Sequence, residues 1–215
     1  MQKIILTLLL AAGFAGAANA QTSIRKRSMG SSGTTSFGVK AGATYSDLIG
    51  TNATDDESIY GFHTGIFANI TLAPHFSFQP ELLYSQKGAS QPIIALPDEF
   101  VTRRFHYLDI PLALHFNAGG FFLETGPQIG FLVLAQDTYN NTRTTLNRNN
   151  FKTADIGYLV GLGFERKTGL GFGARYNGEF SNVNQSVIIG AVTYQQRARN
   201  SAFQLYLTYS FNKAY

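Results

Sequence analysis

The chain has 215 residues, a formal net charge of +4 and no cysteine. This length is enough for one domain with a sizeable core. The lack of cysteine excludes disulfides, thiolate nucleophiles and cysteine metal sites, and so small a positive charge is not typical of a nucleic-acid-binding protein.

The N-terminus has the three parts of a secretory signal peptide. Lys3 supplies a positive charge, residues 4–17 form an apolar stretch, and Ala18-Asn-Ala20 is a small-residue cleavage site. The apolar stretch is too short for a membrane-spanning helix. We therefore expect a signal peptide at 1–20, followed by a flexible lead at 21–35 and one folded domain at 36–215.

From residue 36 onward, apolar residues alternate with small or polar ones, which is the period of a β-strand. In the first such segment, 36–46, Phe37 and Val39 share one face, whereas Gly38 and Lys40 share the other. The same alternation predicts seven more strands, at 60–72, 76–87, 104–116, 121–132, 154–166, 170–180 and 201–211.

The glycines in these strands identify the kind of sheet. A soluble sandwich would expose polar residues and keep glycine rare, because glycine weakens a strand. Here the face opposite the apolar one is rich in glycine and charge, as though another surface crowded it. A small closed barrel with an apolar outside in lipid explains both faces. The sequence therefore predicts an all-β fold, an eight-stranded antiparallel up-and-down transmembrane β-barrel.

One segment resembles a nucleotide-binding motif. Residues 161–168 read GLGFERKT, but Arg166 stands where a phosphate-binding loop needs its second glycine. Three glycines then follow within five residues, which is a poor start for a helix. We interpret the segment as a β-hairpin with a polar turn, so that Gly161 and Gly163 are inward barrel positions.

The connections alternate in length. Those predicted at 73–75, 117–120 and 167–169 are tight, whereas those at 47–59, 88–103, 133–153 and 181–200 are long and polar. Outer-membrane barrels have short periplasmic turns and longer extracellular loops. We therefore expect both termini in the periplasm and the long loops outside the cell.

Four segments carry a resemblance to a known family. FGVKAGATYS at 37–46, YLDIPLAL at 107–114, LETGPQIGFLV at 123–133, and GLGFE with GFGARYN within 161–177 resemble the PorT-like outer-membrane β-barrel family, often labelled porin family protein. The resemblance implies an integral outer-membrane barrel in a Gram-negative cell. The apolar alternation of the last strand also predicts recognition by the barrel-assembly machinery during biogenesis.

The inward face carries ionisable residues. Buried charges persist only when they are paired or hydrogen-bonded, so we expect a charge network centred on Arg175 that fills the lumen. A proton or ion path is the functional alternative. By alternation, the inward set is Lys40, Glu81, Asp109, Glu124, Asp155, Glu165, Arg175 and Glu179.

The sequence does not indicate catalysis. Of the four histidines, only His63 is expected to lie inward near the outer rim, and no nucleophile motif or metal spacing accompanies it. We expect no enzymatic activity, no cofactor and no metal. The predicted role is structural or surface-interacting, with a side-chain-filled lumen. The alternatives are a narrow pore for small solutes and an outer-membrane barrel enzyme.

The predicted loops are rich in arginine. Because lipopolysaccharide phosphates lie at the outer leaflet, we expect rim arginines to contact them through bidentate hydrogen bonds. The candidate residues are Arg103, Arg104, Arg143, Arg148, Arg197 and Arg199.

Overall fold

The computed structural model describes residues 34–50, 57–93, 96–140, 142–146, 153–180, 187–189, 192–194 and 198–211. The expected signal peptide and nearly all of the expected lead lie outside these residues. Over the described ranges, no helix is long and apolar enough to cross a membrane.

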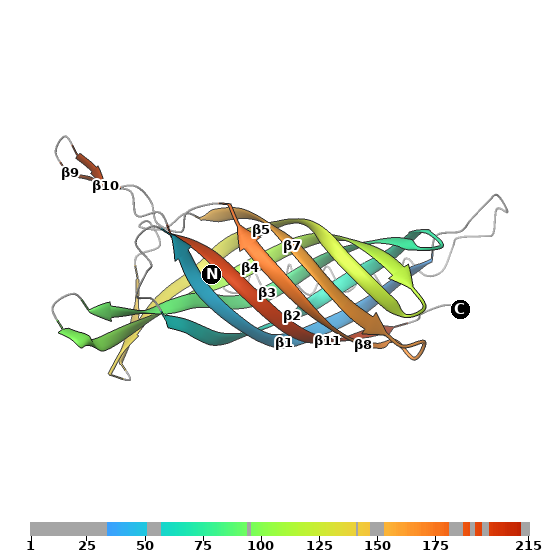
Figure 1. Ribbon diagram of the computed structural model, residues 1–215, viewed down its shortest axis with the longest axis horizontal. Coiled ribbons are helices and arrows are strands. Elements are labelled where there is room, and N and C mark those ends of the chain that lie inside the picture. Colours follow the sequence, from blue (N-terminus) through green and yellow to red (C-terminus); the bar gives the residue numbers. More distant parts are fainter. Residues whose placement is uncertain are drawn as a thin grey trace, which may run out of the picture. The chain divides into compact units, whose positions relative to one another are not determined.

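Eight long strands form a closed antiparallel ring (Figure 1). Each pairs with its neighbour along the chain, and the pairings of β1 with β11 and of β4 with β5 complete the closure. The predicted eight-stranded barrel is therefore confirmed. The ring strands are β1 (Thr35–Gly50), β2 (Glu57–Ala73), β3 (Phe76–Ile93), β4 (Leu96–Ala118), β5 (Phe121–Tyr139), β7 (Ala154–Glu165), β8 (Leu170–Glu179) and β11 (Ala198–Phe211).

Three further strands are short. β6 (Thr142–Thr145) pairs with the end of β5, so that β5 continues into a hairpin beyond the ring. β9 (Val187–Ile189) pairs with β10 (Val192–Tyr194) as a separate two-stranded sheet. All three lie within the connections 133–153 and 181–200, which the sequence predicts to be long.

The alternation of the sequence becomes an inside and an outside. Phe37 and Leu207 are 60% and 62% exposed, whereas Lys40 and Thr44 are 2% and 0% exposed. A surface of exposed aromatic and aliphatic side chains around a polar interior is the inverse of a soluble protein. The predicted faces are thus confirmed, with the apolar one outward.

The short connections lie together at one end of the barrel, which we call the short-turn end (Figure 1). Pro74 and His75 join β2 to β3, and Gly119 and Gly120 join β4 to β5. The two glycines have φ values of 61° and 94°, which a two-residue hairpin turn with positive φ at both positions requires. The opposite end is the long-connection end.

The predicted long loops are partly wrong, because strand pairing continues into them. Most of the expected loop 88–103 is a hairpin of paired β3 and β4 residues, which projects beyond the other strands (Figure 1). Likewise, residues 133–139 belong to β5 and residues 142–145 form β6. Main-chain hydrogen bonds continue without an apolar outer face once the strands leave the lipid, so the period-two signal ends before the strand does.

An apolar cluster of inward side chains lies on the strands toward the long-connection end. Leu146, which follows β6, packs against the cluster and donates its backbone N–H to the carbonyl of Ala135 at 2.9 Å. The β5–β6 hairpin is therefore tied to the barrel interior. The buried members of the cluster are Ala89, Phe105, Tyr107, Leu132 and Ala135.

Candidate functional site

Four charged side chains and one tyrosine meet in the middle of the lumen. They form the Arg175 cluster, made of Lys40, Glu81, Glu124, Arg175 and Tyr206. Arg175 donates through Nε and Nη2 to Glu124 at 2.9 and 2.5 Å, and through Nη1 and Nη2 to Glu81 at 3.0 and 2.9 Å. Lys40 Nζ lies 2.5 Å from Glu81 Oε1, and Tyr206 Oη donates to Glu124 Oε1 at 2.7 Å. Two cations thus face two carboxylates, and the charges balance.

These five residues come from β1, β3, β5, β8 and β11, so the cluster reaches across the barrel. Arg175 is 1% exposed. A buried guanidinium is tolerated only when its donors are satisfied by good geometry, and Arg175 meets this condition with two bidentate carboxylates. The cluster therefore both occupies the lumen and ties distant strands together.

Glycine makes this arrangement possible. Gly161 lies between Glu124 and Arg175 in the register of β5, β7 and β8. A Cβ at Gly161 would lie 2.6 Å from Glu124 Oε1, so a side chain there would displace the carboxylate. Gly161 in the GLGFERKT segment thus leaves room for the ion pair of Glu124 and Arg175. This agrees with the interpretation of the segment as a β-hairpin.

The same relation recurs around the barrel. Large inward side chains repeatedly stand directly opposite a glycine on the next strand, where an added Cβ would meet them or the nearby backbone within 3 Å. The pairs are Phe67 with Gly38, His63 with Gly42, Glu179 with Gly157, Arg175 with Gly161, Phe122 with Gly163, and Tyr206 with Gly173.

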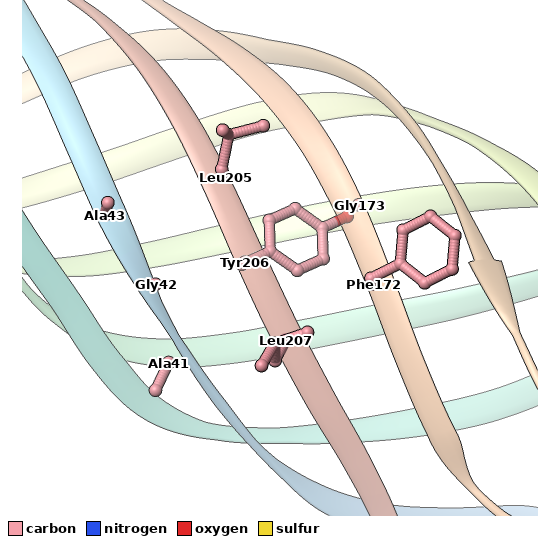
Figure 2. Close-up of a pocket in the computed structure, with 8 residues that line it drawn as sticks. All are labelled: Ala41, Gly42, Ala43, Phe172, Gly173, Leu205, Tyr206 and Leu207. Atoms are coloured by element: carbon pink, nitrogen blue, oxygen red, sulfur yellow. The ribbon is translucent and has the colours of Figure 1, made fainter.

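Tyr206 illustrates the fit at close range. Its ring extends from β11 toward Gly173 on β8 (Figure 2), and a Cβ at Gly173 would lie 2.5 Å from both Cζ and Oη. The ring also carries Lys40 Nζ at 4.1 Å from its centroid, a distance at which cations are attracted to the aromatic face. Tyr206 therefore contacts one cation through its ring and one carboxylate through its hydroxyl.

A second group, the Lys87 cluster, consists of Lys87, Tyr107, Asp109, Glu179 and Asn200. Lys87 Nζ lies 3.0 Å from Asp109 Oδ2 and 2.9 Å from Glu179 Oε1. Asn200 Nδ2 donates to Glu179 at 2.9 Å and to the Tyr107 hydroxyl at 3.3 Å. The buried carboxyl of Asp155 lies close enough to Lys87, Asp109 and Glu179 to interact with their charges. Counting Asp155, one lysine faces three carboxyl groups here.

The structure thus divides the expected single network into two clusters. Arg175 is at the centre of one, with Glu81, Glu124 and Lys40, whereas Asp109 and Glu179 bind Lys87. Glu165 lies apart at the short-turn end and accepts a hydrogen bond from Ser210. Sequence analysis missed Lys87, Tyr107, Asn200 and Tyr206, although Lys87 occupies the next inward position after Ser85 on β3.

Two histidines, His63 and His115, lie inside the lumen and contact polar and aromatic side chains there. His63 hydrogen-bonds to Thr44 at 3.0 Å, and His115 stacks on Phe122 at 4.8 Å with its Nε2 3.3 Å from Glu124. In the described part of the chain, no group of three or more His, Asp or Glu side chains has the arrangement of a metal site. The rings of His63 and His115 thus contact other side chains of the lumen.

The rim arginines have different surroundings. Arg103 makes two 2.8 Å hydrogen bonds to Asp137 across the β4–β5 hairpin. Arg104 donates to the Tyr60 carbonyl, and Arg143 and Arg199 are exposed. Arg148 and Arg197 lie outside the described residues. Farther along the same hairpin, a hydrogen bond to Glu99 raises the pKa of Tyr139.

The outer wall has a depression of about 400 Å³ where β1, β11 and β8 lie side by side (Figure 2). The small outward side chains of Ala41 and Ala43 lie beside the larger Leu205, Leu207 and Phe172. These five side chains are exposed on the outward face, so the depression opens on the outer surface of the barrel.

Comparisons with known proteins agree with this architecture. The model of the family described as outer membrane protein beta-barrel domain matches residues 19–185. Neisserial surface protein A, from Neisseria, is 15% identical and has a TM-score of 0.54, with 83% of this chain and 99% of that chain covered. Ail of Yersinia pestis is 12% identical with a TM-score of 0.47, covering 82% and 99% of the two chains. No curated protein matches the sequence.

Proposed function

The chain belongs to the outer membrane protein beta-barrel domain family, and on this premise we propose that it is a closed barrel with a structural or surface-interacting role. Its family makes it an outer-membrane β-barrel protein. The proposal adds that its lumen does not conduct ions or small solutes. We further propose, from the segments quoted above, that it is PorT-like and that the barrel-assembly machinery inserts it in a Gram-negative outer membrane.

The Arg175 cluster is the observation that carries this proposal. Side chains from five ring strands meet across the lumen. The Lys87 cluster and the apolar cluster around Phe105 occupy further inward positions on β3, β4, β5, β8 and β11. Eight-stranded barrels have interiors just wide enough for side chains to fill, whereas aqueous pores use about 16–18 strands. A filled interior favours a scaffold whose outer surface and connections make the contacts.

A non-enzymatic role is part of the proposal. His63, the candidate at the sequence level, is buried and hydrogen-bonded to Thr44. Its position inside a filled lumen keeps it away from substrates in the membrane or in solution.

Single-channel recording in planar bilayers tests the closed lumen. The purified protein is expected to give no steady open level, while a porin with 16 or more strands, added to the same bilayer, gives one. A steady and large open level for this protein would refute the closed-barrel proposal and favour the narrow-pore alternative.

The proposed orientation places the long-connection end outside the cell and both termini in the periplasm. Single cysteines can test it, because the chain contains none. Thr144 on β6 and Thr168 in a short turn are both exposed and lie at opposite ends. In intact cells, a membrane-impermeant maleimide should label Thr144→Cys, and should label Thr168→Cys only after the outer membrane is broken. The reverse pattern would overturn the orientation.

A further inference from the structure

The outward face of β4 changes from apolar to basic near the long-connection end. Phe105 and Tyr107 point inward and are fully buried, so Arg104 and His106 lie on the outer side of the strand. The outward positions from Leu108 to Phe116 are apolar. These eight residue steps, at about 3.3 Å each and tilted by roughly 40°, span roughly 20 Å, close to the ~25 Å apolar band of outer-membrane barrels. Arg104 and His106 therefore lie just beyond that band.

The neighbouring side chains hold this region in place. Gly88 stands opposite Arg104 on β3 and presents no side chain, so the guanidinium reaches across β3 and donates to the Tyr60 carbonyl on β2 at 2.9 Å. The His106 ring hydrogen-bonds to the Tyr84 hydroxyl at 2.5 Å and to Gln136 at 3.3 Å. Arg104 is thus positioned before any ligand arrives.

The two arginines on the outer side form no ion pair with the carboxylates that the structure describes. Arg103, on the inner side, is paired with Asp137. Arg143 pairs with Thr138 on β5, and Thr138 pairs with Thr102 on β4, so the exposed Arg143 lies on the same outward face as Arg104, two strands away. Among the residues that the structure describes, neither arginine has a carboxylate within ion-pair distance. Two positive charges on one face favour an anion between them.

We propose that this region, the rim patch, binds a phosphate group of an outer-leaflet glycolipid such as lipopolysaccharide. Arg104 and Arg143 supply charge-assisted hydrogen bonds to the phosphate oxygens. Tyr60, which is 74% exposed, offers an aromatic surface for the adjoining sugar. The rim patch consists of Tyr60, Tyr84, Arg104, His106, Gln136 and Arg143.

The position of the rim patch selects a lipid as the source of the phosphate. The patch faces outward directly above lipid-facing side chains, so a headgroup reaches it while its acyl chains contact the apolar wall below. This step rests on the proposed orientation, because the patch meets the outer leaflet only if the long-connection end is outside the cell. Of the rim arginines that the sequence proposes as lipopolysaccharide contacts, the rim patch contains only two, Arg104 and Arg143, which lie on one side of the barrel.

Binding of purified lipopolysaccharide to the folded protein in detergent micelles tests the proposal. The double variant Arg104→Ala/Arg143→Ala should lose at least about tenfold in affinity, since charge-assisted hydrogen bonds are the strong ones. The matched control is Arg199→Ala, which removes an exposed rim arginine on β11, away from the patch. Arg104→Lys/Arg143→Lys should restore part of the affinity, because the charges remain.

The ligand is varied in the same assay. Removing the phosphates of lipopolysaccharide enzymatically should weaken wild-type binding about as much as the double variant does. Inorganic phosphate should compete only weakly; competition at the concentration that suffices for lipopolysaccharide would mean a free-anion site. An equal loss with Arg199→Ala would mean diffuse rim charge and would also overturn the proposal.

Folding of every variant is checked by its heat-modifiable mobility on a gel, and Arg→Gln variants replace Arg→Ala if the latter do not fold. The outcome is separable from the orientation. If Thr144→Cys is labelled from outside and the double variant binds normally, only the rim patch fails. If the labelling pattern is reversed, the orientation fails whatever the binding result.

Discussion

Replacing Arg175 with alanine removes the cation at the centre of the lumen. The variant loses four hydrogen bonds, two to Glu81 and two to Glu124. Glu81 keeps Lys40 at 2.5 Å, but Glu124 keeps only the Tyr206 hydroxyl and the nearby His115 ring. Glu124 is therefore the buried carboxylate that is left without an ion-paired lysine or arginine.

The expected loss in the free energy of unfolding is about 3–5 kcal/mol at neutral pH, the usual cost of removing one partner from a buried ion pair. Most of this loss reflects the charge left on Glu124, so Arg175→Ala/Glu124→Gln should recover much of it. The loss should also shrink as the pH falls, because protonation of the carboxylates removes the charge that lacks a partner. Arg175→Lys should be intermediate, since lysine keeps the charge but cannot form bidentate contacts.

Equilibrium unfolding from lipid vesicles in urea or guanidinium measures these differences. The chain has no tryptophan, so the folded fraction is best read from gel mobility. Arg166→Ala is the matched control, because Arg166 is an exposed arginine in a short turn. If Arg175→Ala unfolds within about 1 kcal/mol of the wild type at neutral pH, the argument that this cation holds the lumen together is wrong.

Three further changes test neighbouring claims by the same unfolding assay. Gly173→Ala should cost about 1–3 kcal/mol by overpacking the Tyr206 ring, and a cost that persists when Tyr206 is also shortened to leucine would contradict that cause. Asp155→Asn should be neutral or stabilising because it removes one of three carboxylates that share a single cation, whereas Glu124→Gln should destabilise; equal losses would refute the charge count. Leu205→Arg should cost roughly 2–4 kcal/mol, as charged residues do on the lipid face of a barrel, while Leu205→Met should be tolerated, and an unchanged arginine variant would mean that the face assignment is wrong.

The fold could be predicted from the sequence because its main signal is local. Alternation with period two fixes which side chains share a face, and each strand carries this signal in its own residues. The strand ends are less local. Residues such as Ser90 and Thr102 pair across the β3–β4 hairpin, but polar residues on both faces give no alternation to detect. For this reason the expected loop at 88–103 is largely strand.

The lumen could be predicted only in part. Alternation identifies Glu81, Asp109 and Arg175 as inward residues, and all three are buried. Which of them meet depends on the register of all eight strands together, since each strand is tilted and offset from the next. Asp109 and Arg175 thus belong to different clusters although both lie near the middles of their strands. No single segment of sequence contains that information.

The inward glycines connect the sequence pattern with the packing of side chains in the lumen. In a narrow lumen, a long inward side chain needs an empty position on the adjacent strand, and Gly161 and Gly173 supply one to Arg175 and Tyr206. A glycine in a strand costs about 0.5–1 kcal/mol relative to alanine, which is smaller than the cost of breaking a buried ion pair. The inward face is therefore rich in glycine because large side chains on the adjacent strands need the space. A barrel built to conduct would gain nothing from such close pairing, because small residues opposite small residues would leave an open path.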